Sequence, residues 1–189
     1  MITPTHAVYN LALLGRRDRP DRTWPILLGA FFPDLPGTFC IFYSFVIQGR
    51  SLERIHEVIY PSAFWQGWAD AFHSIPLALL LGAACLLLKW APGAWFAASA
   101  VLHSLEDFPV HDANPHRHFW PLADWRFQSP LSCYGPGGHV AWVAAADFCL
   151  LAWAAWVLWR RGLPAWGKGL VGTALLLEAA HSILAVLKG

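Results

Sequence analysis

The feature that most constrains this fold is a series of apolar runs that contain almost no charge. The clearest begins at His73, continues without a charged side chain to Leu88 and ends at Lys89. Three further runs cover residues 94–108, 139–159 and 168–187. A helix needs about 20 mainly apolar residues to cross a bilayer. The runs therefore predict an all-α protein, an integral membrane helical bundle that forms one domain over residues 1–189, with four to five membrane-embedded helices.

The amount of apolar side chain is too great for a small soluble core. Hydrophobic residues make up 57% of the 189 residues and charged residues 13%, whereas a soluble domain carries roughly 25% charged residues. Lipid is the natural environment for the excess, so the bilayer is the expected partner. The 12 Trp suit a membrane–water interface. A formal net charge of +1 gives no reason to expect a nucleic-acid partner.

The N-terminal third is predicted to form short helices. A helix over residues 3–14, with Thr3 as N-cap and Pro4 in its first turn, is too short to cross a membrane. No basic region precedes it, so no cleavable signal peptide is expected and His6 is retained. The other segments are apolar stretches at 23–32 and 38–48, a breaker at 33–37, and interfacial segments at 49–60 and 62–72.

Short connections make consecutive helices antiparallel, which sorts the side chains into two ends of the predicted bundle. All nine His map to one end, called here the His-rich end. The opposite, basic end holds no His and collects Arg16, Arg17, Arg19, Arg22, Lys89, Arg160, Arg161 and Lys168. The excess of Lys and Arg predicts that the basic end faces the cytoplasm.

The most specific local signal is the pair His103 and Asp107 at the end of the run over 94–108. Residues four apart share one face of a helix. An imidazole and a carboxylate on one face are able to hold a divalent ion, and His111 follows where the chain folds back. The alternative is a His that caps a carbonyl and an Asp in an ion pair. Ionisable groups at membrane depth are costly and usually functional, which favours the metal site.

Three more segments bring His and Asp to the same predicted end. His6 opens the first helix, Asp34 follows Pro33, and His73 opens an apolar run. Each has a structural alternative: an interfacial His, a turn-capping Asp and a helix-capping His-Ser pair. Together the segments predict a metal site with the ligands His6, Asp34, His73, His103, Asp107 and His111. This mixture suits Zn²⁺, with Mn²⁺ and Fe²⁺ as alternatives.

Two acids stand in the C-terminal apolar runs. Glu178 and His181 are three residues apart, a spacing that either ligates a metal or orients a ligand from the outer shell. Asp147 is predicted to be the buried partner of an Arg or a His.

The loop over residues 116–127 mixes cations with aromatic side chains. One interpretation is a substrate gate in which Arg117 binds a phosphate or carboxylate. The other is an anchor at the membrane interface, with Arg side chains that reach toward the headgroups. The sequence leaves both open.

These motifs, taken in order, resemble the small membrane-bound, predicted metal-dependent hydrolases of bacteria. The matching residues are Thr5-His6, Pro33-Asp34, His73-Ser74, His103-x-x-x-Asp107, Pro121 and Trp125-Arg126-Phe127. The resemblance covers residues 1 to about 134 and implies a multi-pass hydrolase of the bacterial inner membrane. Many relatives carry His-Arg-Gly shortly before the His-Ser, where this chain has Trp68-Ala69-Asp70, so altered ligands or an altered substrate are expected. A fainter similarity links the segment 103–111 to zinc-dependent phospholipase C.

Two function classes stay open. In the first, a metal-activated water attacks an ester or phosphoester of an amphiphilic or lipid substrate. Glu106 or Asp112 then acts as general base, and Arg117 stabilises the developing negative charge. The second class is a non-catalytic membrane protein that binds metal or a partner, or that belongs to a transport system. An open cleft at the His/Asp cluster would favour the enzyme.

Overall fold

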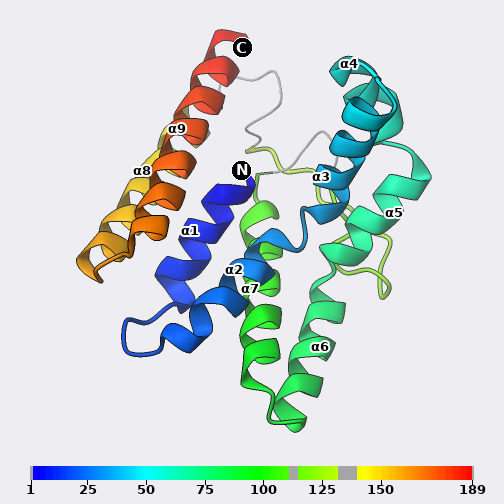
Figure 1. Cartoon of the computed structure of the whole chain (residues 1–189). Coiled ribbons are helices and arrows are strands. Elements are labelled where there is room, and N and C mark those ends of the chain that lie inside the picture. Colours follow the sequence, from blue (N-terminus) through cyan, green and yellow to red (C-terminus); the bar gives the residue numbers. More distant parts are fainter. Residues whose placement is uncertain (1, 111–114, 132–139, 189) are drawn as a thin grey trace.

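The computed structural model describes residues 2–110, 115–131 and 140–188, with the side chains of all of these except 140, 181 and 184–188. The described chain consists of helices and loops, which confirms the all-α prediction (Figure 1). The α-helices are α1 Thr3–Leu14, α2 Thr23–Phe31, α3 Leu35–Phe42, α4 Leu52–Arg54, α5 Ala63–Phe72, α6 Ile75–Leu87, α7 Ala91–Asp107, α8 Val140–Arg160 and α9 Ala165–Lys188. A 3-10 turn covers Pro20–Arg22, and π-helical segments cover Tyr43–Ile47 and Ile55–Ile59.

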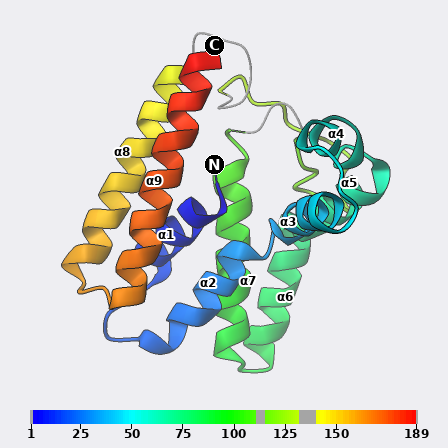
Figure 2. The same ribbon diagram turned by 45° about the horizontal axis from the view of Figure 1, so that its top comes forward.

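Helices α3 and α5 pack on each other, and the helices outside α3–α5 form two groups that meet at α1. Helices α6 and α2 pack on α7, and α8 pairs with α9 as a hairpin. Helix α1 packs against members of both groups, α2 and α7 on one side and α8 and α9 on the other (Figure 2). The connections after α1, α6 and α8 lie at one end of the bundle, as the antiparallel map predicts for the basic end (Figure 1).

Helix α1 is unusual because polar side chains are buried in it beside the apolar ones. Residues 5–12 are all buried, and a buried polar group is costly unless it is hydrogen-bonded. Each polar side chain therefore has a partner on another helix. The pairs are Thr5 with Glu178, Tyr9 with Asp147 and Asn10 with Ser99. The partner of Asp147 is thus a tyrosine hydroxyl and not the predicted Arg or His.

A glycine sets the close approach of α2 to α7. A Cβ atom at Gly29 would lie 2.2 Å from the carbonyl oxygen of Phe96 and 2.8 Å from Cβ of Ser99. No side chain larger than hydrogen fits there unless the two helices separate. Small residues at helix crossings are a common feature of membrane bundles.

Two pairs of helices are continuous except for a sharp bend. The segments Pro20–Phe31 and Leu35–Ile47 meet at 59°, and Ala63–Phe72 and Ile75–Leu87 meet at 41°. The first bend is shorter than the breaker predicted at 33–37, because Pro36 lies in the first turn of α3. The main-chain nitrogens of a first turn have no partner within the helix, so a proline there costs no hydrogen bond. The sequence also predicts a turn at Pro92-Gly93, but Pro92 lies in the first turn of α7 and the chain turns before it.

Among the described residues, one helix is long and apolar enough to cross a membrane alone, namely α8 over Ala141–Arg160. The number rises to as many as three if each bent pair counts as one span. The run over 73–88, predicted to be the clearest span, forms the 13-residue helix α6. At 1.5 Å per residue α6 is too short to cross without α5.

Candidate metal centre

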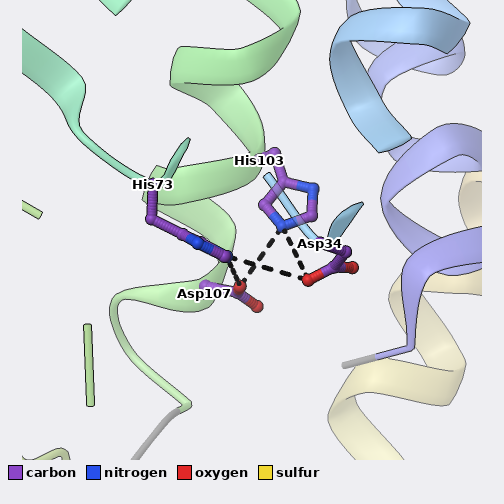
Figure 3. A group of neighbouring side chains, drawn as sticks. All are labelled: Asp34, His73, His103 and Asp107. Atoms are coloured by element: carbon purple, nitrogen blue, oxygen red, sulfur yellow. Dashed lines mark ion pairs between the residues drawn. The ribbon is translucent and has the colours of Figure 1, made fainter. Parts of the chain in front are cut away.

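Both helix bends hold a residue of the predicted metal site. Asp34 lies in the bend between α2 and α3, and His73 lies in the bend between α5 and α6. The last two turns of α7 supply His103 and Asp107 on one face. The antiparallel order of the helices brings these four side chains together, although they come from three separate parts of the sequence (Figure 3).

The four residues offer ligand atoms that all lie within 4.8 Å of one another. Nε2 of His103 is 3.3 Å from Asp107 Oδ2 and 3.6 Å from Asp34 Oδ1. Nε2 of His73 is 3.5 Å and 3.7 Å from the same two oxygens. Ligands held about 2.0–2.1 Å from a tetrahedral zinc are about 3.3–3.4 Å apart. The spacing therefore fits a single divalent ion.

The two imidazoles are fixed by main-chain carbonyls. Nδ1 of His73 is 2.8 Å from the carbonyl oxygen of Ala69, and Nδ1 of His103 is 2.7 Å from that of Ala30. A carbonyl only accepts hydrogen bonds, so each Nδ1 carries a proton. A neutral ring then directs its Nε2 lone pair at the carboxylate oxygens. This second hydrogen bond is the usual way in which proteins orient a histidine that ligates metal.

The Nε2 atoms of both rings are buried, and neither has a hydrogen-bond partner within the described part of the chain. His73, His103 and Asp107 are each at most 2% exposed. Nitrogen lone pairs that face carboxylate oxygens in a largely buried site repel unless a cation lies between them or each imidazole takes up a second proton. The donor set, with two imidazoles and two carboxylates, fits a metal ion in that position.

Helix α1 adds an outer layer to the cluster through Thr3 and His6, which are one turn apart. The hydroxyl of Thr3 donates to Asp34 Oδ2 at 2.6 Å. This use explains why Ile2, and not Thr3 as predicted, occupies the N-cap position of α1. His6 Nε2 is 3.1 Å from Asp107 Oδ1, and its ring stacks on that of His103 with centroids 3.8 Å apart. Each metal-site carboxylate thus has its second oxygen engaged by α1.

Glu106 reaches the cluster indirectly. Its Oε2 is 2.7 Å from Nδ1 of His6, so Glu106, His6 and Asp107 form a chain of contacts. Because carboxylate oxygens face both ring nitrogens, His6 donates to Glu106 and to Asp107 only when both nitrogens carry a proton.

A cleft of about 330 Å³ opens beside Asp34, whose side chain is 26% exposed. The cleft lies between the start of α1, helix α3 and the π-helical segment Ile55–Ile59. Its lining combines apolar and polar side chains: Ile2, Thr3, Pro4, Asp34, Gly37, Thr38, Ile41, His56 and Tyr60. Asp34 is the member of the four-residue cluster that borders this cleft.

The loop over 115–127 is held by one buried acid. Asp70 is fully buried and accepts from the main chain and Nε of Arg117, and from both terminal nitrogens of Arg126. The hydrogen bond to Asp70 raises the pKa of Arg117, so this guanidinium remains charged. A second contact joins Arg117 to Asp124 at 2.6 Å. These contacts hold the two arginines within the protein, and both interpretations of the loop stay open.

The loop also covers one ligand. The ring of His116 stacks on that of His73 with centroids 3.8 Å apart. The carbonyl oxygen of His118 accepts from the main-chain N–H of Ile75, and that of Trp120 accepts from the hydroxyl of Ser74. The loop therefore closes the bend that presents His73.

The predicted site residues divide into three sets. Asp34, His73, His103 and Asp107 form the cluster, His6 contacts Asp107, and Glu106 contacts His6. Arg117 is held on Asp70, and its proposed catalytic role stays a prediction. His111 and Asp112 lie outside the described residues, as does the side chain of His181.

Three residues that complete the site were not predicted from the sequence: Thr3, Asp70 and His116. Thr3 is two residues from the motif Thr5-His6 and was interpreted as a cap. Asp70 stands where the family resemblance leads one to expect a glycine, and an acid in an otherwise apolar helix was a usable signal. Nothing in the sequence near His116 distinguishes it from the other His of its loop.

Comparison of the chain with protein-family models, curated proteins and solved structures gives no match. The resemblance to bacterial membrane hydrolases therefore stays a prediction. The functional argument depends on the geometry of the cluster.

Proposed function

We propose that this chain is a membrane-embedded metal-dependent hydrolase that acts on an ester or phosphoester. The observation that carries the proposal is the pair of imidazoles, each bonded through Nδ1 to a main-chain carbonyl and each directing Nε2 at the same two carboxylate oxygens. Zinc is the proposed ion, since two imidazoles and two carboxylates form a donor set that zinc accepts.

The residues divide the tasks as follows. Asp34, His73, His103 and Asp107 hold the ion, and a bound zinc supplies a Lewis acid and an activated water. Thr3 and His6 orient the carboxylates through their second oxygens. Glu106 orients the ring of His6 through its contact with Nδ1.

The cleft beside Asp34 is the proposed entry for substrate. It reaches the one ligand of the four that is partly exposed, and its lining is mainly apolar with hydroxyl and imidazole groups among it. Such a lining suits an amphiphilic or lipid ester, whose reactive group would lie against polar atoms. This cleft is the observation that favours an enzyme over a closed, purely structural metal site.

The bundle is proposed to cross the inner membrane of a bacterium several times, with four to five embedded helices. The bent pairs α2–α3 and α5–α6 would act as broken spans and α8 as a single span, with α7 and α9 embedded beside them. Large exposed apolar side chains support this, for instance Leu80 at 67% and Leu87 at 85% on α6, and Leu176 at 74% on α9. Apolar surface on this scale is costly in water. Discontinuous helices often carry the functional site of a membrane protein.

Two measurements on the purified full chain in detergent test the proposal. Elemental analysis should find close to one Zn²⁺ per chain in the wild type, a loss in Asp34→Asn, and wild-type content in His56→Ala, which alters a neighbouring exposed His. Chromogenic esters, phosphomonoesters and phosphodiesters in mixed micelles should then be hydrolysed by the zinc-loaded chain. Chelation should abolish the hydrolysis and added Zn²⁺ should restore it.

The outcomes separate the rival interpretations. Absence of bound metal in both Asp34→Asn and the wild type, even after added Zn²⁺, Mn²⁺ or Fe²⁺, would mean that protons on the imidazoles balance the carboxylates. Metal bound by the wild type without hydrolysis of any ester class would favour the non-catalytic metal-binding protein.

A further inference from the structure

A second pocket lies at the basic end of the bundle, away from the metal cluster. Its volume is about 340 Å³, and it lies between the connection from α1 to α2 and the turn from α8 to α9. Three arginines line it, Arg16, Arg17 and Arg161, and no acidic residue does. The rest of its wall is largely apolar and includes Trp24 and Trp166.

The arginines of this pocket differ in how their charge is balanced. Arg16 donates two hydrogen bonds to the exposed Asp18. Arg17 and Arg161 have no carboxylate within 4.0 Å among the described residues. Both therefore contribute positive charge that no neighbouring acid cancels.

Each of these two arginines reaches from its own end of the pocket to the connection on the other side. Nη1 of Arg161, at the end of α8, donates to the carbonyl oxygens of Leu11 and Gly15 at the end of α1. Arg17, from the other connection, reaches the α8–α9 turn, where its Cζ is 4.0 Å from a Cβ built on Gly162. The positive φ of 80° at Gly162 allows the tight turn that makes this approach possible. The pocket is thus built by the fold and is not a chance gap between exposed side chains.

The surroundings of the pocket have the composition of a membrane interface. Trp24 stacks on Trp166 with ring centroids 5.4 Å apart. Around them, three cations lie over indole rings: Arg22 over Trp95 at 4.1 Å, Lys168 over Trp159 at 5.1 Å and Arg160 over Trp156 at 5.9 Å. Tryptophans and cations concentrate at the level of the lipid headgroups.

We propose that this pocket binds the phosphate headgroup of an anionic phospholipid. Arg17 and Arg161 would contact the phosphate, while the apolar wall, including Leu158 and Leu163, would contact the adjoining glycerol and acyl carbons. A free phosphate ion would leave that wall unused. The inference shares the membrane location of the proposed function but not its metal chemistry.

Native mass spectrometry of the delipidated full chain, prepared without metal, tests this inference. The probes are a phosphatidylglycerol and a phosphatidylcholine with identical acyl chains. The wild type should bind the anionic lipid more tightly, and Arg17→Gln should lower that affinity about five-fold, the expected contribution of one arginine near a membrane surface. Arg19→Gln is the matched control, because Arg19 belongs to the same connection but pairs with Asp21 and does not line the pocket.

Four results would overturn the inference: equal affinity for the two lipids, equal effects of Arg17→Gln and Arg19→Gln, displacement of the anionic lipid by millimolar inorganic phosphate, or loss of binding in Arg17→Lys. Retained binding in Arg17→Lys, which keeps the charge, would support it. A thermal unfolding curve for each variant separates loss of the pocket from loss of the fold. If the protein is not embedded in a membrane at all, the purified chain would stay in solution without detergent, and this separate result would contradict the proposed function.

Discussion

Oε2 of Glu106 lies 2.7 Å from Nδ1 of His6, whose Nε2 faces Asp107 Oδ1 at 3.1 Å. This geometry makes Glu106 a positioning residue that acts on the metal through two others. Glu106→Gln should therefore weaken zinc binding roughly ten-fold, as changes around a metal ligand commonly do. Competition with a chromophoric chelator measures the affinity, with Glu57→Gln, an exposed acid, as control. Unchanged zinc affinity with a lower kcat would instead identify Glu106 as the general base.

Asp107→Asn should remove bound metal, whereas Asp147→Asn should not. Asp107 faces the Nε2 atoms of two imidazoles, while the Asp147 carboxylate accepts from the hydroxyl of Tyr9. Both residues are buried acids, so they form a matched pair. Elemental analysis after gel filtration reads the result. Equal metal content in the two variants would refute the assignment.

Zinc should stabilise the fold, because the ligands come from three separate helical segments that the ion would hold together. A ligand at about 100 times its Kd adds about 2.7 kcal/mol to the free energy of unfolding. Thermal unfolding in detergent, with and without added Zn²⁺, should show a rise in Tm of several degrees for the wild type. The rise should vanish in His73→Ala. A shift of equal size in that variant would place the stabilising ion elsewhere.

Asp70→Asn should loosen the loop that covers His73. Its loss leaves Arg117 and Arg126 without the buried carboxylate that holds them, and because both guanidinium groups are partly exposed, the cost is below the roughly 3 kcal/mol of a fully buried pair. Limited proteolysis should cut within 115–127 faster in this variant. Asp124→Asn is the control, since Asp124 contacts the same Arg117 but is 88% exposed, so its pair is screened by solvent. Equal cleavage of the two variants would argue against Asp70 as the anchor.

Gly29→Ala should separate α2 from α7 and lower both stability and metal binding. The new Cβ would meet the carbonyl oxygen of Phe96 at 2.2 Å, and overpacking of this kind costs about 1–3 kcal/mol. Because Asp34 follows α2 and His103 stands on α7, the shift would also spread the ligands. Gly67→Ala, where nothing lies within 4 Å, should have no such effect. Tm and zinc content are the two measurements. Wild-type values of both in Gly29→Ala would show that the helices accommodate the methyl group, and would contradict the prediction.

Most of the helices, their order and the four residues of the cluster could be predicted from local patterns in the sequence. Apolar runs and proline breaks are local signals, and an i, i+4 pair such as His103 and Asp107 shares a face in any α-helix. Antiparallel connection of short-looped helices then places Asp34 and His73 at the same end. These features depend on neighbours in the chain, so they could be predicted from the residues alone.

The hydrogen bonds that orient those residues depend on how the helices pack. The acceptor for Nδ1 of His103 is the carbonyl of Ala30, 73 positions away, and the donor to Asp34 is Thr3, 31 positions away. The bends that present Asp34 and His73 also divide two apolar stretches into helices that are too short to cross a membrane alone. Hydrogen-bond partners and bend angles follow from how helices pack, and every polar group buried on packing must find a partner there. The sequence pattern does not specify which partner that will be.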